Sequence, residues 1–372
     1  DIKIKGKTDT LTSAYFAIDV TDPLNPDFLW EFTASDLNLT VCYPTVIKVR
    51  NSWYLIFGSG PEICAGECAV GVHATVYVLD LATGALRQKW AFPDDQSFIT
   101  NIFGVDWGMD YSVDRVYFGD CYHDLAIEGE WGGKIYRIDT NNETNPAVWD
   151  TNFVFDMERP ITAEGTIATD DYNHLWVYFG TGRFFSEIDE VDATTQRYVG
   201  FRDDTTRATT VAGLYNVTSV KVDTNDNIIF PSGHTGSFAD LIDTVNAHGG
   251  WWREHLGMHE RNLTTSLVFG GAVLYTTYLP SHDICSYGGT GRLYALYYRT
   301  GTAHINPSFL RAQGNLHYPY CVDVGQGMPS EPSLYVSGDQ IKVFIQAAGG
   351  IVTPETGLPG LPRTGVILWK GR

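Results

Sequence analysis

Three carboxylates recur at every fourth position in one short loop of the sequence. Asp106, Asp110 and Asp114 lie in a stretch that joins two strand-like runs, and Ser112 stands between the last two of them. Calcium takes about six to eight oxygen ligands, which a curling loop supplies from spaced carboxylates and a backbone carbonyl. These residues match positions 1, 5, 7 and 9 of such a loop, with the Ser112 carbonyl at position 7. The spacing therefore predicts a metal site for Ca²⁺, the cofactor that we expect.

Two positions of this loop depart from the calcium pattern. Gly108 stands at position 3, where a charged or amide side chain is usual, and Tyr111 stands where a glycine is expected. The first change removes a ligand, and the second places a bulky residue at a left-handed turn that favours glycine. A solvated acidic turn in an acidic protein is therefore the alternative interpretation of the loop.

The spacing of the cysteines favours one local disulfide. Cys64 and Cys68 lie in a short Gly-containing loop, whereas Cys121, Cys285 and Cys321 are isolated, so the second pair that a zinc knuckle needs is absent. We predict a disulfide between Cys64 and Cys68, with two free thiols or a metal site as alternatives. A disulfide in turn predicts an extracytoplasmic location.

The sequence contains no recognisable catalytic motif. His255 and His259 stand four residues apart, but the metalloprotease order His-Glu-x-x-His is absent, and we expect no metal there. A Gly-x-Ser-x-Gly nucleophile elbow and a phosphate-binding Gly-x-x-x-x-Gly-Lys-Ser/Thr loop are also absent. We therefore predict a protein that is not an enzyme and has no catalytic residues.

The elements that position the acidic loop belong to a repeated pattern. The first half-repeat is a strand, a turn and an aromatic-rich strand that ends in small residues. Its six copies are 44–58, 103–120, 165–180, 219–230, 265–276 and 333–345. The second half-repeat is a strand, a Thr-Gly turn and a strand that often closes on Trp. It is clearest at 76–90, with further copies at 15–30, 134–149 and 293–301. Two hairpins per unit make a four-stranded antiparallel sheet.

Repeated four-stranded sheets are typical of a β-propeller. A β-sandwich would need about seven to nine strands in roughly 100 residues and would not repeat this motif. We therefore predict an all-β, single-domain propeller over residues 1–372, either a ring of seven blades with one incomplete or a ring of six. The hairpin at 15–32 lacks a preceding hairpin, and the terminal strand at 365–369 leaves the last blade one strand short, so we expect the N-terminus to help close the ring.

Composition excludes several classes of function. The chain has 372 residues and a formal net charge of −19, with 44% hydrophobic residues. An acidic surface repels phosphates, which disfavours nucleic-acid binding and docking on anionic lipid. The absence of a run of about 18 apolar residues predicts no membrane-spanning helix. Residues 1–7 carry no apolar signal-peptide core, so we expect any export signal to lie outside this sequence.

The half-repeats together resemble the C-terminal propeller of the PilY/PilC family of type IV pilus biogenesis proteins. The residues that carry the resemblance are 15–26, 29–32, 114–120, 159–162, 176–183, 285–289, 293–296 and 366–370. The resemblance implies a modified seven-bladed propeller with Ca²⁺ in the acidic loop. Asp106, Asp110, Ser112 and Asp114 would be the ligands.

The same resemblance implies a non-enzymatic role in pilus extension against retraction and in adhesion. The implied partners are pilin or minor pilin subunits and a host or abiotic surface, with no nucleic acid and no membrane insertion. The implied location is extracytoplasmic, at the pilus tip, associated with the outer membrane or secreted.

Two other functions fit a ring of Trp-rich blades. The first is a periplasmic quinoprotein dehydrogenase of the PQQ type, which would carry a catalytic Asp near a calcium-bound quinone and usually two adjacent cysteines. No adjacent cysteines occur in the sequence, which counts against this function. The second is a carbohydrate-binding propeller, which a glycan-binding screen would detect.

Overall fold

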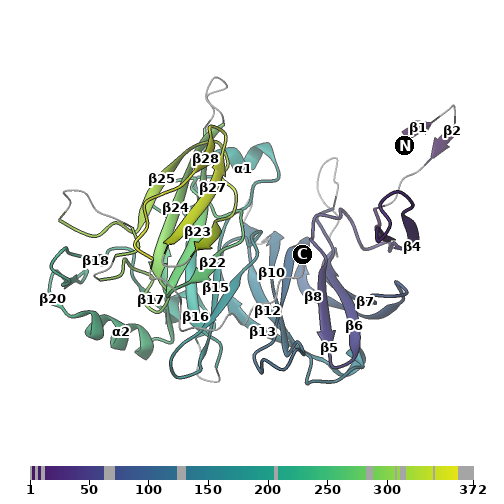
Figure 1. Cartoon of the computed structure of the whole chain (residues 1–372), viewed down its shortest axis with the longest axis horizontal. Helices are drawn as coiled ribbons and strands as arrows, with labels where there is room; N and C mark the ends of the chain where they lie inside the picture. Colours follow the sequence, from purple (N-terminus) through teal and green to yellow (C-terminus); the bar gives the residue numbers. More distant parts are fainter. Residues whose placement is uncertain are drawn as a thin grey trace. The chain divides into compact units, whose positions relative to one another are not determined.

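The computed structural model describes residues 2–4, 7–9, 13–62, 72–123, 131–204, 208–281, 288–305, 308–310, 316–337 and 340–358. Nearly all of their regular structure is β-strand, as predicted (Figure 1). The chain divides into two compact units, one with residues up to 131 and 136–153, the other with 132–135 and residues from 154 onward. The predicted single domain over 1–372 stays a prediction.

The first unit is built around a four-stranded antiparallel sheet. Its strands, in order across the sheet, are β5 (Thr45–Val49), β6 (Ser52–Gly58), β7 (His73–Asp80) and β8 (Leu86–Asp95). Two short hairpins precede it in the sequence, formed by β1 (Ile2–Ile4) with β2 (Lys7–Asp9) and by β3 (Tyr15–Asp19) with β4 (Asp27–Phe32). The predicted pairs at 44–58 and 76–90 are thus both confirmed as hairpins.

The next sheet contains the strands that border the acidic loop. It runs in the order β11–β10–β12–β13, and β9 pairs with β10. The strands are β9 (Ser97–Val105), β10 (Arg115–His123), β11 (Trp131–Gly132), β12 (Lys134–Asp139) and β13 (Asp150–Asp156), and the 3₁₀ turn η1 (Pro146–Val148) precedes β13. Val105 pairs with Arg115 at the end of the β9–β10 hairpin, so the loop 106–114 connects two strands in register.

Among the described residues, four further sheets lie in the second unit. The first, in order, is β14 (Thr166–Thr169), β15 (Leu175–Gly180), β16 (Arg197–Arg202), β21 (Gly250–Glu254) and β17 (Tyr215–Asn216). The second is β18 (Lys221–Val222), β19 (Ile228–Ile229) and β20 (Thr235–Gly236). The third is β22 (Leu267–Phe269), β23 (Ala272–Pro280), β24 (Gly289–Tyr297) and β25 (Cys321–Gln326), and the fourth is β26 (Ser333–Ser337), β27 (Gln340–Ala347) and β28 (Gly350–Val352).

The sheets are less uniform than the sequence predicts. Four strands in sequential order occur in β5–β8 and β22–β25, whereas the other sheets among the described residues have two, three or five strands. The clearest difference follows β16, because the strand that pairs with it is β21, about 50 residues later in the chain. The intervening segment forms the small β18–β20 sheet and a helix. The predicted strand pair at 219–230 is confirmed as the β18–β19 hairpin, but its sheet has three strands instead of four.

The helix α2 (Phe238–Ala247) is a feature that the strand pattern does not predict, and the short helix α1 (Glu187–Val191) is another. The start of α2 is a capping box, in which the Ser237 hydroxyl accepts a hydrogen bond from the Asp240 amide while the Asp240 carboxylate accepts one from the Ser237 amide. Phe238, Leu241 and Val245 are buried on one face. The local signal was therefore present in the sequence.

The Thr-Gly turns of the second half-repeat dock on tryptophans. In the first unit, the Trp30 indole donates to the Leu81 carbonyl at 3.0 Å, and a Cβ on Gly84 would lie 2.6 Å from the indole ring. In the second unit, the Trp251 indole makes the equivalent bond to Tyr298 at 2.9 Å and covers Gly301. The repeat therefore has a packing reason: the glycine leaves room for the indole ring.

Aromatic side chains dominate the core of each unit. In the first unit Phe57 stacks on Tyr77 with ring centroids 5.5 Å apart. In the second unit Tyr275 lies between Tyr198, at 3.9 Å, and Tyr294, at 4.8 Å. These rings are buried in the cores of the two units. In the described part of the chain, neither α-helix has the length and apolar character needed to cross a membrane.

Candidate functional site

The acidic loop 106–114 closes the hairpin between β9 and β10 in the first unit. Its tip is exposed, since Met109 and Tyr111 are 66% and 85% accessible. Both adopt a left-handed backbone, with φ of 53° at Met109 and 65° at Tyr111. Tyr111 therefore adopts the left-handed backbone at the position where the calcium-loop pattern has a glycine.

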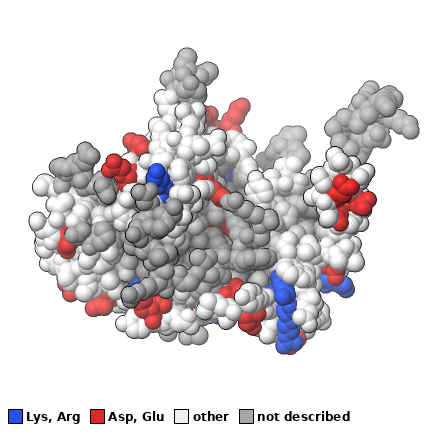
Figure 2. All heavy atoms as spheres, in the orientation of Figure 1, with Lys and Arg blue, Asp and Glu red and all other residues white. Residues whose placement is uncertain are grey.

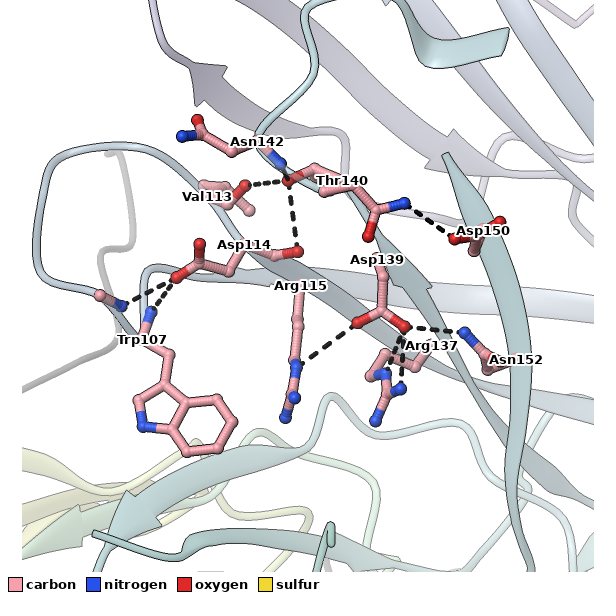
Figure 3. Close-up of polar contacts among 12 residues, drawn as sticks. Trp107, Val113, Asp114, Arg115, Arg137, Asp139, Thr140, Asn142, Asp150 and Asn152 are labelled. Atoms are coloured by element: carbon pink, nitrogen blue, oxygen red, sulfur yellow. Dashed lines mark hydrogen bonds and ion pairs between the residues drawn. The ribbon is translucent and has the colours of Figure 1, made fainter. Parts of the chain in front are cut away.

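The carboxylates of the loop accept hydrogen bonds from the loop's own backbone. Asp106 accepts from the amides of Asp110, at 3.1 Å, and Tyr111, at 2.7 Å. Asp114 accepts from the amides of Trp107 and Gly108, both at 2.8 Å, through a single oxygen (Figure 3). These bonds satisfy amides that a tight turn leaves without backbone partners.

Asp110 and Ser112 complete the loop in different ways. One Asp110 oxygen accepts from the Ser112 amide at 2.9 Å. The Ser112 hydroxyl is nearly buried, accepts from the Arg50 amide at 3.0 Å and donates to the Asn142 side chain at 3.1 Å. The Ser112 side chain thus anchors the loop to two neighbouring turns. The prediction concerned a different group, the Ser112 carbonyl, as a calcium ligand.

Beside the loop, two further networks hold the ends of the neighbouring strands. The fully buried Thr140 hydroxyl lies 2.7 Å from the Val113 carbonyl and 3.3 Å from that of Asp114, and accepts from the Asn142 amide (Figure 3). The Asp139 carboxylate binds several donors. These are the Arg115 and Arg137 guanidinium groups and the Asn152 side chain, at 3.4, 2.8 and 2.7 Å.

Arg115 also connects the second network to the loop. Its guanidinium lies 4.3 Å from the centroid of the Trp107 indole, a cation–π distance. Trp107 is therefore held twice: its indole stacks on the Arg115 guanidinium, and its amide donates to the Asp114 carboxylate. The loop is thus a rigid base with an exposed tip.

The loop carboxylates are engaged mainly with the loop's own backbone. Both Asp106 oxygens and one oxygen each of Asp110 and Asp114 are bonded to loop amides. Across the residues that the structure describes, no three His, Cys, Asp or Glu side chains are grouped to hold one metal ion. Calcium binding by Asp106, Asp110, Ser112 and Asp114 stays a prediction.

The predicted disulfide lies outside the described residues, because Cys64, Cys68 and Cys285 all fall there. Cys42 and Cys121 are buried. Cys321 is a free thiol, and burial raises its pKa to about 11, so it is protonated and unreactive near neutral pH. The pairing of Cys64 with Cys68 therefore stays a prediction.

The strongest buried polar cluster of the second unit surrounds Glu260, which sequence reasoning missed. Its buried carboxylate accepts from Arg292 at 2.7 Å, Thr277 at 2.6 Å, Tyr294 at 2.8 Å and the Gly257 amide at 2.7 Å. Burial alone would raise the pKa of Glu260, but neighbouring His255 and these donors hold the pKa below its usual value. A carboxylate saturated in this way stabilises the fold and has little capacity left for proton transfer.

His255 and His259, which stand out in the sequence, do not share a site. The buried His255 ring bonds through Nδ1 to the Glu260 carbonyl at 3.1 Å, whereas His259 bonds to the Asp192 carbonyl at 2.8 Å. Burial lowers the pKa of His255, so its imidazole is neutral near pH 7.

The chain carries a formal net charge of −19. On the face drawn in Figure 2, acidic side chains of the described residues form small separate groups, with a few basic side chains among them. No broad field of one sign covers that face, so the charge itself does not mark a binding site there.

Comparison with known proteins identifies relatives of this chain. No family model matches it. It is 26% identical over 298 residues to a type IV pilus biogenesis factor PilY1 homolog of Xylella fastidiosa, covering 77% of this chain and 23% of that protein. It is 25% identical over 346 residues to the type IV pilus biogenesis factor PilY1 of Pseudomonas aeruginosa, covering 77% of this chain and 28% of that protein. The chain thus spans about a quarter of the length of these curated relatives.

The fold has a counterpart among solved structures. The crystal structure of the Pseudomonas aeruginosa PilY1 C-terminal domain superimposes with a TM-score of 0.65 and 18% identity, over 92% of this chain and 79% of that domain. This match and the sequence relatives confirm the predicted resemblance to the PilY-type C-terminal domain. The predicted all-β propeller class is confirmed with it, and the number of blades stays a prediction.

Proposed function

We propose that this chain is the C-terminal propeller of a PilY-type pilus biogenesis factor and acts outside the cytoplasm in type IV pilus assembly. One observation carries this proposal. The similarity to PilY1 proteins covers 77% of the chain in sequence and 92% in fold, so it is not confined to one motif. Because the part of this chain that aligns makes up only 23% and 28% of these relatives, the proposed role is that of one module within a larger protein.

We propose further that the module supports pilus extension and attachment without catalysis. The relatives are named as biogenesis factors, which supports an assembly role. The acidic groups described above also support it, because Glu260 is saturated by donors and the loop carboxylates are engaged with loop amides. Pilin or minor pilin subunits and a host or abiotic surface are the proposed partners, with the pilus tip as the proposed location.

Calcium regulation is a separate part of the proposal. It is supported by the loop's aspartates and their spacing, and by the resemblance to the family. In this proposal calcium would bind the exposed tip of loop 106–114, where Asp110 has an oxygen that is not bonded to a loop amide.

The proposed function is tested in the organism that carries this chain. An in-frame deletion of the region encoding residues 13–358 should reduce the amount of pilin sheared from the cell surface, with total cellular pilin unchanged. Complementation with the wild-type sequence should restore it, and so should Gly349→Ala, since a Cβ there meets no atom within 4 Å. Normal surface piliation in the deletion strain would contradict the proposal.

The quinoprotein alternative needs its own measurement. A purified sample should show no absorbance band of a bound quinone. A quinone present at unit stoichiometry would overturn the non-enzymatic proposal, whatever the outcome of the deletion.

A further inference from the structure

A cleft of about 690 Å³ opens at one edge of the first unit. It lies between the β5–β6 turn, the β7–β8 turn and the segment that leads into η1. The residues that matter below are Asn51, Trp53, Tyr54, Asp80, Arg87 and Asn145, all of which line it. Its volume falls within the range of roughly 300–1,000 Å³ that is typical of small-molecule sites.

One wall of the cleft is held rigidly by the core. Tyr54 is nearly buried, and its hydroxyl donates to the Thr144 carbonyl. Its ring packs edge-on against Trp149, with centroids 5.5 Å apart and the planes at 84°. Because the Thr144 carbonyl belongs to the cleft lining, this bond ties two of the three bordering segments together. The cleft is therefore pre-formed.

Trp53 adds an amphipathic aromatic surface. The residue is 42% exposed although it lies in a strand, and Lys48 Nζ lies 5.6 Å from its ring centroid. Exposed indoles at the border of a cleft are suited to ligands that have an apolar face and polar edges.

The charged groups in the cleft neutralise each other. Asp80 accepts from Arg87 at 2.8 Å and, through its other oxygen, from the Thr83 amide and hydroxyl. These bonds, that of Arg87 first, lower the pKa of Asp80. Since Arg87 balances this carboxylate, the Asp80–Arg87 pair adds no net charge to the cleft.

The remaining hydrogen-bonding groups are neutral amides and spare guanidinium donors. The Asn145 side-chain oxygen caps η1 by accepting from the Ala147 amide at 3.2 Å, which leaves the NH₂ group as a donor. Asn51, in the exposed β5–β6 turn, contributes a second amide, and Arg87 uses only Nη2 in its ion pair. Planar side chains of this kind can bond to pairs of neighbouring hydroxyl groups.

From this combination we propose that the cleft binds a neutral saccharide. The Trp53 indole contacts the C–H face of a sugar ring, and Arg87, Asn51 and Asn145 bind its hydroxyl groups. The Asp80–Arg87 pair offers a charged ligand no free counter-charge, and a purely apolar ligand would leave these donors unpaired. This inference stands on the cleft alone and does not depend on the proposed pilus role.

Saturation-transfer NMR and calorimetry test the site on the purified chain. The probes are maltose, lactose, mannobiose and N,N′-diacetylchitobiose, with 3′-sialyllactose as an anionic comparison. We expect at least one neutral disaccharide to bind at millimolar concentration or below. Failure of all four neutral probes at millimolar concentration, or binding of sialyllactose alone, would overturn the proposal.

Variants locate the binding. Trp53→Ala should weaken the affinity by about tenfold or more, and Asn51→Ala, in an exposed turn, by about threefold to tenfold. Tyr172→Ala removes a 73%-exposed aromatic residue outside the cleft and should leave the affinity unchanged. If Trp53→Ala fails to fold, the affinity of Asn51→Ala alone decides whether the saccharide binds in the cleft. Wild-type affinity in a folded cleft variant would show that the sugar binds elsewhere and would overturn the assignment.

Discussion

The indole of Trp251 covers Gly301 so closely that a Cβ at Gly301 would lie 2.2 Å from the ring. Gly301 also has a φ of 65°, a conformation that side chains disfavour. The glycine is therefore required for two independent reasons, space and backbone. The indole is held in place by its hydrogen bond to the Tyr298 carbonyl.

Gly301→Ala should consequently lower the free energy of unfolding by about 2–4 kcal/mol, since both overpacking and a strained backbone contribute. Urea unfolding of the purified chain measures the loss. Gly349→Ala is the matched control, because nothing lies within 4 Å of its Cβ position, and it should change stability by less than about 0.5 kcal/mol. Equal effects of the two substitutions would refute the docking argument.

The Glu260–Arg292 pair should be far more important for stability than an exposed pair of the same residue types. Removing the buried carboxylate in Glu260→Ala leaves several donors without an acceptor, and we expect a loss of about 3–5 kcal/mol. The control is Glu158→Ala, since Glu158 is 45% exposed and pairs with Arg197 at 3.1 Å. That change should cost at most about 1 kcal/mol in the same urea experiment. A loss below about 1 kcal/mol for Glu260→Ala would contradict this assignment.

Stability should fall as the pH drops, beginning near the ordinary pKa of histidine. Burial lowers the pKa of His255, so below about pH 6.5 the unfolded state binds a proton at this residue more readily than the folded state does. The free energy of unfolding therefore decreases as the pH falls. Glu260, whose pKa is also lowered, adds a further loss below its ordinary value of 4.5.

The contribution of His255 can be isolated with a substitution. In His255→Gln the melting temperature should depend less steeply on pH between about pH 7 and pH 5 than in the wild type. His234→Gln, at an exposed histidine, serves as control and should leave the slope unchanged. Parallel curves for His255→Gln and the wild type would rule out a titration of His255.

The hydroxyl of Thr140 should be needed to hold the acidic loop. Thr140→Val keeps the shape of the side chain but leaves the Val113 carbonyl and the Asn142 amide without this partner, and it should cost about 1–3 kcal/mol. Thr144→Val, at an exposed threonine, should be nearly neutral. Thermal unfolding of the two variants compares them directly, and a neutral Thr140→Val would show that the network is dispensable.

Calcium binding by the loop, if present, should be weak. The aspartates would have to exchange bonds to loop amides for bonds to the ion, and Gly108 supplies no side-chain ligand. We expect a dissociation constant of about 10⁻⁴–10⁻³ M or weaker in calorimetry, and its loss in Asp110→Ala. No measurable heat with the wild type would mean that the loop is only a turn.

The sequence predicted the hairpins well because their cause is local. Short apolar runs separated by turn residues indicate which neighbouring segments pair, and the pairs at β5–β6, β14–β15 and β26–β27 follow this pattern. The strain at Tyr111 was predictable in the same way, from a loop position that favours a left-handed backbone. The capping box of Ser237 and Asp240 is also a local signal in the sequence. The strand pattern did not include it, so α2 was not predicted.

Tertiary structure alone decided the rest. The return of β21 to β16, the donors that converge on Glu260 and the cleft beside Trp53 all join residues far apart in the chain. Local periodicity carries no information about which distant strands become neighbours, whereas packing and hydrogen bonding depend on that choice. The aspartates of the acidic loop illustrate the division: the sequence determined their spacing and the turn, and only the folded loop decided that their oxygens bind its own amides.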